Sequence, residues 1–398
     1  MTNMLYTPKG EIDARIQAFQ SSLALQGLDG ALIIHHTNLF YLSGTSQSGH
    51  LFIPCSGEPL LMVRKSYQRA LQESPITQIM EVKSLKIIPD ILLKKGFNTE
   101  KLGLELDVIP YNTWLVYKKV FKDSDMTDIS EPLKKIRMIK SDHEIKLLKG
   151  ACVILDQVFD EVPAMIREGM TEIELASLFE AGLRRRGYAG CSKMRAFNQD
   201  FFLGNVVTGY SGAVPSYFDS AVNGSGLTPA NNPHGAGWKS IARNEIIFID
   251  YSCLINGYTA DGARMFVLGS ISDQLQQAHH AALNIQKEII DMIRPGIICE
   301  DIYERAVSLA EEVGLQEHFM GIGNDRARFI GHGLGLELDE YPIFAKGMKM
   351  PLEAGMTFAL EGPKFVFAEG AIGIENTCCL KADGLEVLTR APQEITFL

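Results

Sequence analysis

The sequence contains an internal repeat, which constrains the fold more than any other feature. Residues 165–169 read MIREG, and residues 292–296 read MIRPG. Each copy follows a long amphipathic segment and leads into a helical segment that ends at a glycine. That glycine lies 18 positions after the glycine of the repeat in both copies, since 187 − 169 equals 314 − 296. Strand-like sequence follows each copy, so we expect two similar α/β halves in one domain, with a site in the cleft between them.

A separate small α/β domain is expected before the repeat. GEIDARIQAFQSSLALQG and IIPDILLKKG predict helices, and DGALIIH, HLFIPCS, PLLMVR and KLGLELD predict strands. The charged stretch EPLKKIRMIKSDHE is interpreted as a linker. We therefore expect a first domain over residues 1–132 and a second over residues 133–398, in the α/β (α+β) class.

A new helix is expected to start after this linker. Ser141 and Glu144 have the spacing of a capping box. The predicted core face consists of apolar residues spaced by three or four: Ile145, Leu148, Cys152, Leu155, Phe159 and Val162.

Charge and cysteine usage exclude several classes of partner. The formal net charge is −10, from 38 basic and 48 acidic residues, which argues against nucleic acids and anionic membranes as partners. No apolar run approaches the length that spans a bilayer, and the first residues lack the pattern of a secretory signal. The seven cysteines are scattered, so we expect reduced thiols in a cytoplasmic protein.

A first predicted hairpin brings two aspartates close together. Residues 245–269 contain two β-rich runs around the Asn-Gly turn at 256–257, which places Asp261 opposite Ser252 and diagonal to Asp250. If the pair is buried, it needs compensating cations. The alternative is a solvent-facing pair with ordinary salt-bridge partners.

A second predicted hairpin brings two glutamates together. In TFALEGPKFVFAEGAIGIENTCCL, Glu361 and Glu375 are equally far from Ala368 and would face each other. His332 adds an imidazole between two glycines in GHGLGLELDEYP, where the alternative is a glycine-rich turn that merely contains a histidine. Four carboxylates and one imidazole suit Mn²⁺ best, although Zn²⁺, Co²⁺ and Fe²⁺ also fit. Four carboxylates exceed the charge that one divalent ion needs, which points to two ions.

These motifs resemble those of the pita-bread (M24) metallopeptidases, which include methionine aminopeptidase, Xaa-Pro aminopeptidase, prolidase and creatinase. TNLFYLSG resembles the creatinase/prolidase N-terminal domain, and KKIRMIKSDHEIKLLKGA the usual start of the catalytic domain. The resemblance covers nearly the whole chain and implies a pita-bread domain with a pseudo-two-fold duplication. Two motifs depart from the family: Ala263 stands where threonine is usual, and EGPKF where glutamate-proline-glycine is usual. The residues that match the five metal ligands of the family are Asp250, Asp261, His332, Glu361 and Glu375.

The resemblance implies a metal-dependent aminopeptidase or dipeptidase for short peptides, including those with Xaa-Pro bonds. A water bridging two metal ions would be deprotonated and attack the scissile carbonyl. Glu361 would be both ligand and proton shuttle, and His234 would stabilise the tetrahedral intermediate. The alternative for His234 is a histidine in a proline- and asparagine-rich loop.

Asp339 stands where the proline-directed peptidases usually have a second substrate histidine. It is interpreted as a protonated acid, a contact for a cationic substrate group or a base; the alternative is a surface acid beside Glu337 and Glu340. We expect Asp339→His to change substrate preference more than metal content.

The long segment 188–233 is rich in glycine, asparagine and aromatic residues and is expected to build the substrate pocket, with Tyr217, Phe218 and Asp219 as contacts. Two other functions stay open. One is a hydrolase or lyase for a non-peptide small molecule, as in creatinase, ectoine hydrolase and dimethylsulfoniopropionate lyase. The other is a catalytically inactive binding module. The resemblance also implies a homodimer.

Overall fold

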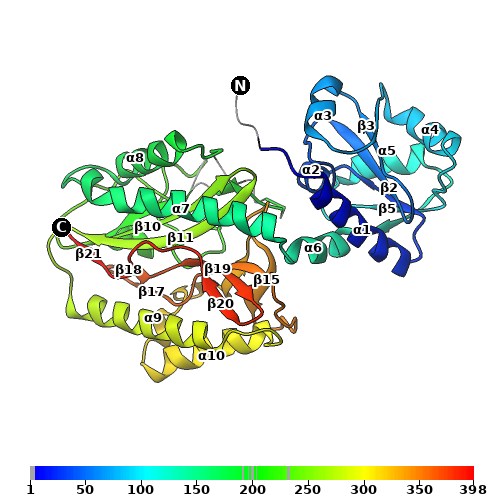
Figure 1. Ribbon diagram of the computed structural model, residues 1–398. Coiled ribbons are helices and arrows are strands. Elements are labelled where there is room, and N and C mark those ends of the chain that lie inside the picture. The colour runs from blue at the N-terminus through cyan, green and yellow to red at the C-terminus, as the bar shows by residue number, and fades with distance from the viewer. Residues whose placement is uncertain (1–4, 191, 196, 199–200, 203, 231–233) are drawn as a thin grey trace. The chain divides into compact units, whose positions relative to one another are not determined.

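The structure is a computed structural model that describes residues 5–190, 192–195, 197–198, 201–202, 204–230 and 234–398. It divides into two compact units, Met1–Arg137 and Met138–Leu398 (Figure 1). The boundary expected between residues 132 and 133 lies inside a helix, α6 (Ser130–Met138). The division between the units, after Arg137, falls within the stretch interpreted as a linker, and part of that stretch is helical. The helix forms because Leu133 and Arg137 are buried, and Arg137 donates a hydrogen bond to Oδ1 of Asn38 within the first unit.

The first unit is built on a six-stranded mixed sheet in the order β4-β3-β2-β1-β5-β6. The predicted strands and helices of this unit are confirmed, and its core contains Leu32, Phe52, Met62 and Leu102. Its helices are α1 (Lys9–Leu25), α2 (His36–Ser43), α3 (Tyr67–Glu73), α4 (Ile88–Lys94) and α5 (Tyr111–Val120), with a 3₁₀ turn at Leu85–Ile87. Its strands are β1 (Gly30–Ile33), β2 (Gly49–Pro54), β3 (Leu60–Val63), β4 (Gln78–Glu81), β5 (Lys101–Leu104) and β6 (Asp125–Asp128).

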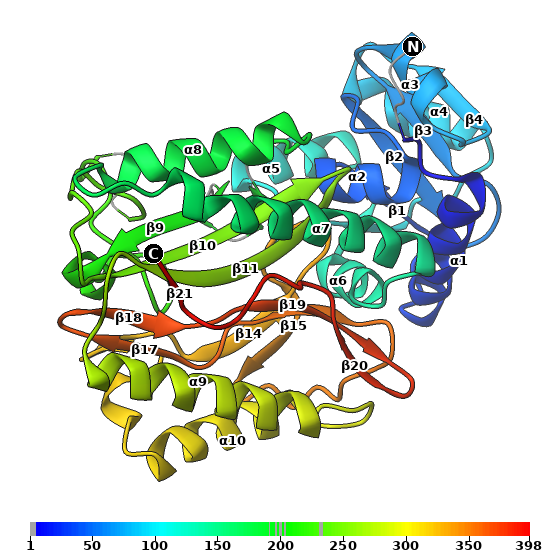
Figure 2. The ribbon, with the colours of Figure 1, turned by 60° about the vertical axis from the view of Figure 1, so that its left-hand side comes forward.

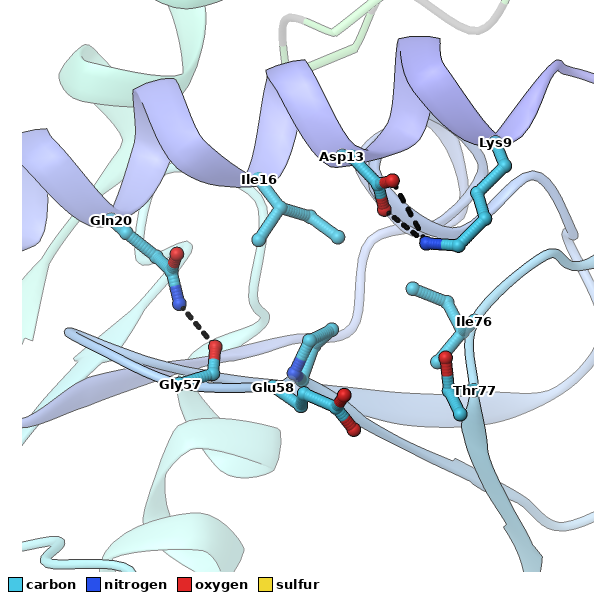
Figure 3. Close-up of a pocket in the computed structure, with 9 residues that line it drawn as sticks. Lys9, Asp13, Ile16, Gln20, Gly57, Glu58, Ile76 and Thr77 are labelled. Carbon is cyan, nitrogen blue, oxygen red and sulfur yellow. Dashed lines mark hydrogen bonds and ion pairs between the residues drawn. The ribbon is translucent and has the colours of Figure 1, made fainter.

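A cavity of the first unit lies beside α1. Its polar groups already bind one another: Lys9 Nζ lies 2.7 Å from Asp13 Oδ1, and Gln20 Nε2 donates to the carbonyl oxygen of Gly57 at 2.8 Å (Figure 3). These are solvent-exposed pairs of the kind that contribute little to stability. The cavity therefore indicates no particular chemistry.

The second unit packs helices on both sides of two layers of strands. In Figure 2, α7 and α8 lie over β9, β10 and β11, and α9 and α10 lie on the side of β14 to β19. Its helices are α7 (Asp142–Met165), α8 (Glu172–Arg185), α9 (Asp273–Met292) and α10 (Cys299–Glu312), with 3₁₀ turns at Gly209–Ala213 and Gln316–His318. Its strands are β7 (Ser192–Lys193), β8 (Phe201–Phe202), β9 (Gly204–Thr208), β10 (Ile246–Ile255), β11 (Tyr258–Val267), β12 (Gly321–Ile322), β13 (Asp325–Arg326), β14 (Phe329–Gly333), β15 (Glu340–Ala345), β16 (Thr357–Leu360), β17 (Lys364–Phe367), β18 (Gly370–Gly373), β19 (Asn376–Lys381), β20 (Gly384–Val387) and β21 (Thr396–Phe397).

The strands of this unit form two main sheets, β21-β11-β10-β9 and β15-β14-β16-β19-β20. Helix α7 starts at a capping box formed by Ser141 and Glu144, as predicted, and all six residues of its predicted core face are buried. The six cysteines among the described residues are free. None of the described helices has both the length and the apolar character that crossing a bilayer requires.

The internal repeat is confirmed by equivalent backbone contacts in the two halves. The N–H of Gly169 donates to the carbonyl of Ile241, and the N–H of Gly296 donates to the carbonyl of Leu352. Both glycines have positive φ, and the helices that follow them, α8 and α10, are each 14 residues long. The unit is therefore a duplicated α/β structure, which places its central strands between the two helix pairs.

Candidate metal centre

The first hairpin has the predicted register. Strands β10 and β11 pair Ser252 with Asp261 and Asp250 with Ala263, and the turn residues Asn256 and Gly257 both have positive φ. All ten positions of each strand are buried, because α7 packs on the hairpin. Asp250 and Asp261 are only 5% and 3% exposed, which excludes the solvent-facing alternative.

The second pair of acids follows the predicted register of the outer strands. The last pair of the β16–β19 ladder joins Leu360, the end of β16, to Asn376, the start of β19. Glu361 and Glu375 are the next residues along and would form the next pair in the same register. The two glutamates are not paired with each other, because the register changes beyond them. The inner strands β17 and β18 pair Lys364 with Gly373, which is shifted by one residue from the register of β16 and β19. Instead, the N–H and C=O of Glu375 exchange hydrogen bonds with Ala263, at 3.4 and 3.3 Å. This bridge joins the two hairpins and brings their acids together.

His332 lies on β14, between β15 and β16, where the backbones approach closely. A Cβ atom at Gly331 would lie 2.5 Å from the carbonyl oxygen of Ala359, and one at Gly333 would lie 2.1 Å from that of Tyr341. Neither position has room for a side chain. The flanking glycines thus permit the close backbone approach on both sides of His332.

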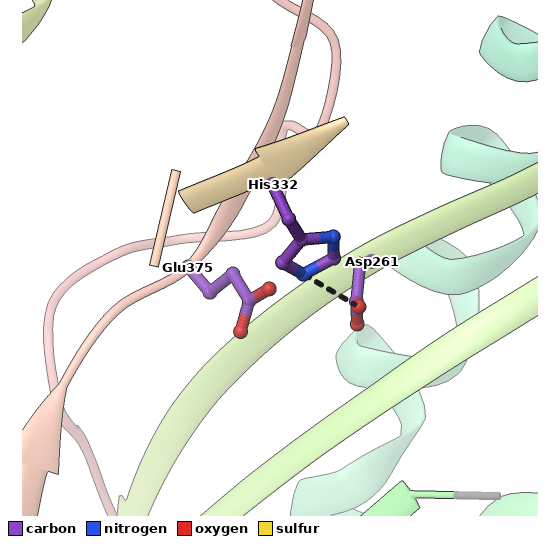
Figure 4. Close-up of side chains that lie close together, drawn as sticks. All are labelled: Asp261, His332 and Glu375. Atoms are coloured by element: carbon purple, nitrogen blue, oxygen red, sulfur yellow. Dashed lines mark ion pairs between the residues drawn. The ribbon is translucent and has the colours of Figure 1, made fainter. Parts of the chain in front are cut away.

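The predicted ligands converge in one buried cluster. Ligand atoms of Asp261, His332 and Glu375 lie within 4.8 Å of one another (Figure 4). His332 Nε2 faces the acids, at 3.2 Å from Glu361 Oε1 and 3.9 Å from Asp261 Oδ2. All four, together with Asp250, line the same cavity. The structure thus brings the five residues together, and their role as metal ligands stays a prediction.

A charged residue that the sequence reasoning did not assign lies inside this cluster. The ammonium Nζ of Lys364 is 2.9 Å from Asp250 Oδ2, 2.9 Å from Glu375 Oε2 and 3.2 Å from Glu361 Oε2. Its side chain is 1% exposed. The signal was present in EGPKF, where a lysine begins an otherwise apolar strand. The charge count that pointed to two metal ions did not include this cation.

The local charges shift the pKa values of the cluster in opposite directions. Burial raises the pKa of Asp250, and burial together with the neighbouring carboxylates raises those of Asp261 and Glu375 well above their usual range. Burial alone would also raise the pKa of Glu361, but Lys364 and His332 lower it to about 2. Burial would lower the pKa of Lys364, but its three carboxylates raise it well above the usual range. The cluster therefore favours cations.

The donor set fits one divalent ion better than two. Asp261, His332 and Glu375 offer oxygen and imidazole nitrogen atoms at nearly the separation expected for ligands of one ion, with Glu361 beside them. A second ion bound by Asp250 and Glu375 would compete with the ammonium of Lys364 for the same oxygens.

Asp339 lines the same cavity, although its side chain stays partly open to solvent. Its Oδ1 lies 3.2 Å from His332 Nδ1, the ring nitrogen that faces away from the acid cluster. Its backbone has φ 59°, and its side chain is 37% exposed. Burial raises the pKa of its carboxyl group, and the opposing effect of the nearby His332 is smaller. Histidines that bind metals commonly donate their other N–H to such a carboxylate.

The predicted substrate residues are only partly brought to the cavity. Phe218 and Asp219 line it. The His234 ring stacks on Phe218 at 5.0 Å between centroids and meets Tyr217 edge-on at 5.7 Å. Among the described residues that line the cavity, neither His234 nor Tyr217 appears, and Tyr217 is exposed. Part of segment 188–233 lies outside the described residues, namely 191, 196, 199–200, 203 and 231–233.

Two further residues position the ligands and were not predicted. Arg264 donates from Nη1 to the carbonyl oxygen of Glu375 at 2.7 Å and from Nη2 to Oδ1 of Asn376 at 2.9 Å. Thr377 Oγ1 accepts from the N–H of Asp261 at 2.8 Å and donates to its carbonyl at 2.7 Å. These contacts fix the two acid-bearing backbones to each other. They depend on strands remote in sequence, so no local pattern announces them.

Comparisons with known proteins agree with this arrangement. A family model described as metallopeptidase family M24 matches residues 146–382, and the creatinase/prolidase N-terminal domain matches residues 15–139. The Xaa-Pro dipeptidase of Pyrococcus furiosus is 26% identical over 384 residues, which cover 96% of this chain and 99% of that protein. A peptidase of Bacillus subtilis called YqhT is also 26% identical, over 96% of this chain and 100% of its own length.

Solved structures resemble the whole chain. The Xaa-Pro dipeptidase from Bacillus anthracis superposes with a TM-score of 0.83 at 26% identity, covering 97% of this chain and 100% of that one. The prolidase from Pyrococcus horikoshii superposes with a TM-score of 0.80 at 26% identity, covering 96% and 99%. The similarity therefore extends over both units of the chain.

Proposed function

Because the chain belongs to metallopeptidase family M24, we propose that it is a metal-dependent dipeptidase that hydrolyses short peptides at the bond before proline. The family and the two-domain α/β class expected from the sequence are confirmed. One observation carries the proposal: residues from three strands and from two segments next to strands converge as four carboxylates and one imidazole in a single cavity. The relatives called Xaa-Pro dipeptidase and prolidase support the substrate.

A divalent ion is the cofactor implied by the family, and we propose Mn²⁺ because most of the donors are oxygens with one nitrogen. Asp261, His332, Glu361 and Glu375 would hold it. When bound, such an ion lowers the pKa of water and polarises a carbonyl group.

The chain's own residues would position the peptide and move the proton. Glu361, whose carboxylate reaches both His332 and Lys364, stays ionised and is the group placed to accept a proton and pass it to the leaving nitrogen. Asp219 and Asp339 line the cavity beside the cluster, where a carboxylate would contact the cationic amino group of a dipeptide. Phe218 supplies an apolar wall for a proline ring.

A substrate panel tests the function. Purified protein loaded with Mn²⁺ is expected to hydrolyse Xaa-Pro dipeptides faster than longer Xaa-Pro peptides and non-peptide amides. Preference for a small amide would support the non-peptide hydrolase, for which the acidic lining by Asp219 and Asp339 is the specific observation. Metal binding without any hydrolysis would indicate the binding module.

We also propose a cytoplasmic homodimer. The free cysteines of the described residues support a reducing compartment, and the family resemblance supports the dimer. Light scattering during size-exclusion chromatography would test the assembly, with a mass of about 88 kDa expected for two chains of 44.0 kDa each.

A further inference from the structure

Lys364 is held inside the acid cluster by its backbone position and by the space around it. It is the first residue of β17 and pairs with Gly373 of β18. A Cβ atom at Gly373 would lie 2.7 Å from Cγ and 2.8 Å from Cα of Lys364. Glycine at 373 thus leaves room for the lysine stem, which leads from the strand to the carboxylates. The side chain is buried along its length rather than folded in from the surface.

The ammonium is fully paired. A lysine has three N–H donors, and the three contacted oxygens belong to Asp250, Glu361 and Glu375. The ring centroid of Phe248 lies 5.8 Å from Nζ. Removal of a buried charge from such a set leaves its partners uncompensated. The geometry is that of a cation site already filled by the protein.

Three of the candidate metal donors form a second set, which shares only Glu375 with the partners of Lys364. Asp261, His332 and Glu375 gather within 4.8 Å, and of the four cluster acids among the described residues, Asp261 has no ion pair with Lys364. Glu375 therefore stands between the ammonium on one side and the Asp261–His332 set on the other. With four carboxylates, one lysine and one divalent ion, the net charge is −4 + 1 + 2 = −1. The cluster is then nearly neutral without a second ion.

We infer that Lys364 is a built-in cation that takes the place of one of the two ions expected from the family resemblance, so that each chain binds a single divalent ion. The inference builds on the proposed metal dependence, but it concerns the composition of the centre and not the substrate. Asp250 is then a partner of the lysine instead of a metal ligand.

Ion counting tests this inference without any activity measurement. Metal-free protein is dialysed to equilibrium against Mn²⁺, and the bound ions are counted by mass spectrometry, for the wild type, Lys364→Met and Lys149→Met. Methionine keeps most of the volume of lysine without its charge. Lys149 of α7, which is half-buried and pairs with Glu386 at 2.6 Å, is the matched control. The expected counts are one ion per chain for the wild type and the control, and two for Lys364→Met.

Asp250→Asn provides a second measurement. If Asp250 pairs only with Lys364, this variant still binds one ion per chain. Two ions in the wild type, or one in a folded Lys364→Met protein, would overturn the inference. If Lys364→Met does not fold, the wild-type count and that of Asp250→Asn decide the question. A protein that binds one ion but cleaves no peptide supports the role of Lys364 and contradicts the proposed peptidase, so the two failures are distinguishable.

Discussion

The Nδ1 atom of His332 lies 3.2 Å from Oδ1 of Asp339, while Nε2 of the same ring faces Glu361 and Asp261. One side of the imidazole is therefore oriented by a carboxylate, and the other is directed at the proposed metal. Nδ1 also lies 3.2 Å from the carbonyl oxygen of Gly333, so an Nδ1–H has two acceptors on that side, and the lone pair on Nε2 is available to a cation. Asp339 thus acquires a positioning role in addition to the substrate contact expected from the sequence.

Replacement of Asp339 by alanine should weaken metal binding. The imidazole loses the charged one of the two acceptors beside Nδ1, and the loss of such a carboxylate partner costs roughly 10- to 100-fold in metal affinity. Calorimetric titration of metal-free protein with Mn²⁺ measures the change. Asp339→Asn keeps an acceptor oxygen and should retain more of the affinity than alanine. Equal affinities in all three proteins would argue against the positioning role.

Asp339→His tests the substrate contact expected from the sequence. An imidazole in the cavity can donate a hydrogen bond where an ionised carboxylate cannot. We expect the ratio of kcat/KM for Xaa-Pro dipeptides to that for other dipeptides to change more than the metal content does. Steady-state kinetics and metal analysis on the same preparation check this. An unchanged ratio would show that Asp339 does not touch the substrate.

Removal of the metal should destabilise the protein. An ion that binds only the folded state stabilises it by about 2.7 kcal/mol at a free concentration of 100 times Kd. Thermal unfolding with chelator and with added Mn²⁺ should show this difference. His332→Ala should abolish the effect of Mn²⁺, whereas His280→Ala, an exposed histidine on α9, should retain it. A Mn²⁺ effect that survives His332→Ala would place the ion elsewhere.

Gly333→Ala should be strongly destabilising. The new Cβ would lie 2.1 Å from the carbonyl oxygen of Tyr341, a backbone atom that cannot rotate away. A loss of roughly 3 kcal/mol in the free energy of unfolding is expected, at the upper end for overpacking. The matched control is Gly150→Ala, on α7, where a Cβ meets nothing within 4 Å. That control should gain up to about 1 kcal/mol, because alanine is the better helix former. Urea unfolding of both variants compares them.

The first unit should lose stability in acid through His50. Its Nε2 lies 2.7 Å from Oη of Tyr117, and burial, aided by the charge of Arg64, lowers its pKa from 6.5 to about 4. The unfolded chain therefore binds the proton more tightly than the folded one. This contribution, about 3 kcal/mol at most, is fully present above pH 6.5 and is lost as the pH falls towards 4.

Hydrogen exchange of the β2 amides from pH 7 to pH 4.5 measures the effect of His50. The wild type should lose protection as the pH falls, and His50→Gln should show a flatter profile. His36→Gln alters an exposed histidine of the same unit and should behave as the wild type. The same loss of protection in His50→Gln would assign the acid sensitivity to another group.

Much of the site could be predicted because its parts are local hairpins. The Asn256-Gly257 turn fixes the register of β10 and β11, so the place of Asp261 opposite Ser252 follows from the sequence alone. For Glu361 and Glu375, symmetry about Ala368 predicted the outer register, although the inner strands slip by one residue. Side-chain period and turn chemistry determine both results.

The unpredicted parts depend on contacts between elements remote in sequence. The role of Lys364 depends on its contact with Asp250 of β10, a residue that lies 114 positions earlier in the chain. The contact between Asp339 and His332 requires a backbone with φ 59°, which a run of acidic residues does not signal. The helical form of α6 was not predicted within the expected linker, because its charged residues mask the few apolar ones that it buries.

The duplicated architecture divides the residues of the acid cluster between its halves. Asp250 and Asp261 lie on the hairpin that follows the first copy of the repeat, and His332, Glu361 and Glu375 follow the second. Neither half carries a complete donor set. If the chain were divided between β11 and α9, neither fragment alone would bind the metal ion, and binding would return only when the two fragments associate. Metal binding would thus report on the correct association of the two halves of the second unit.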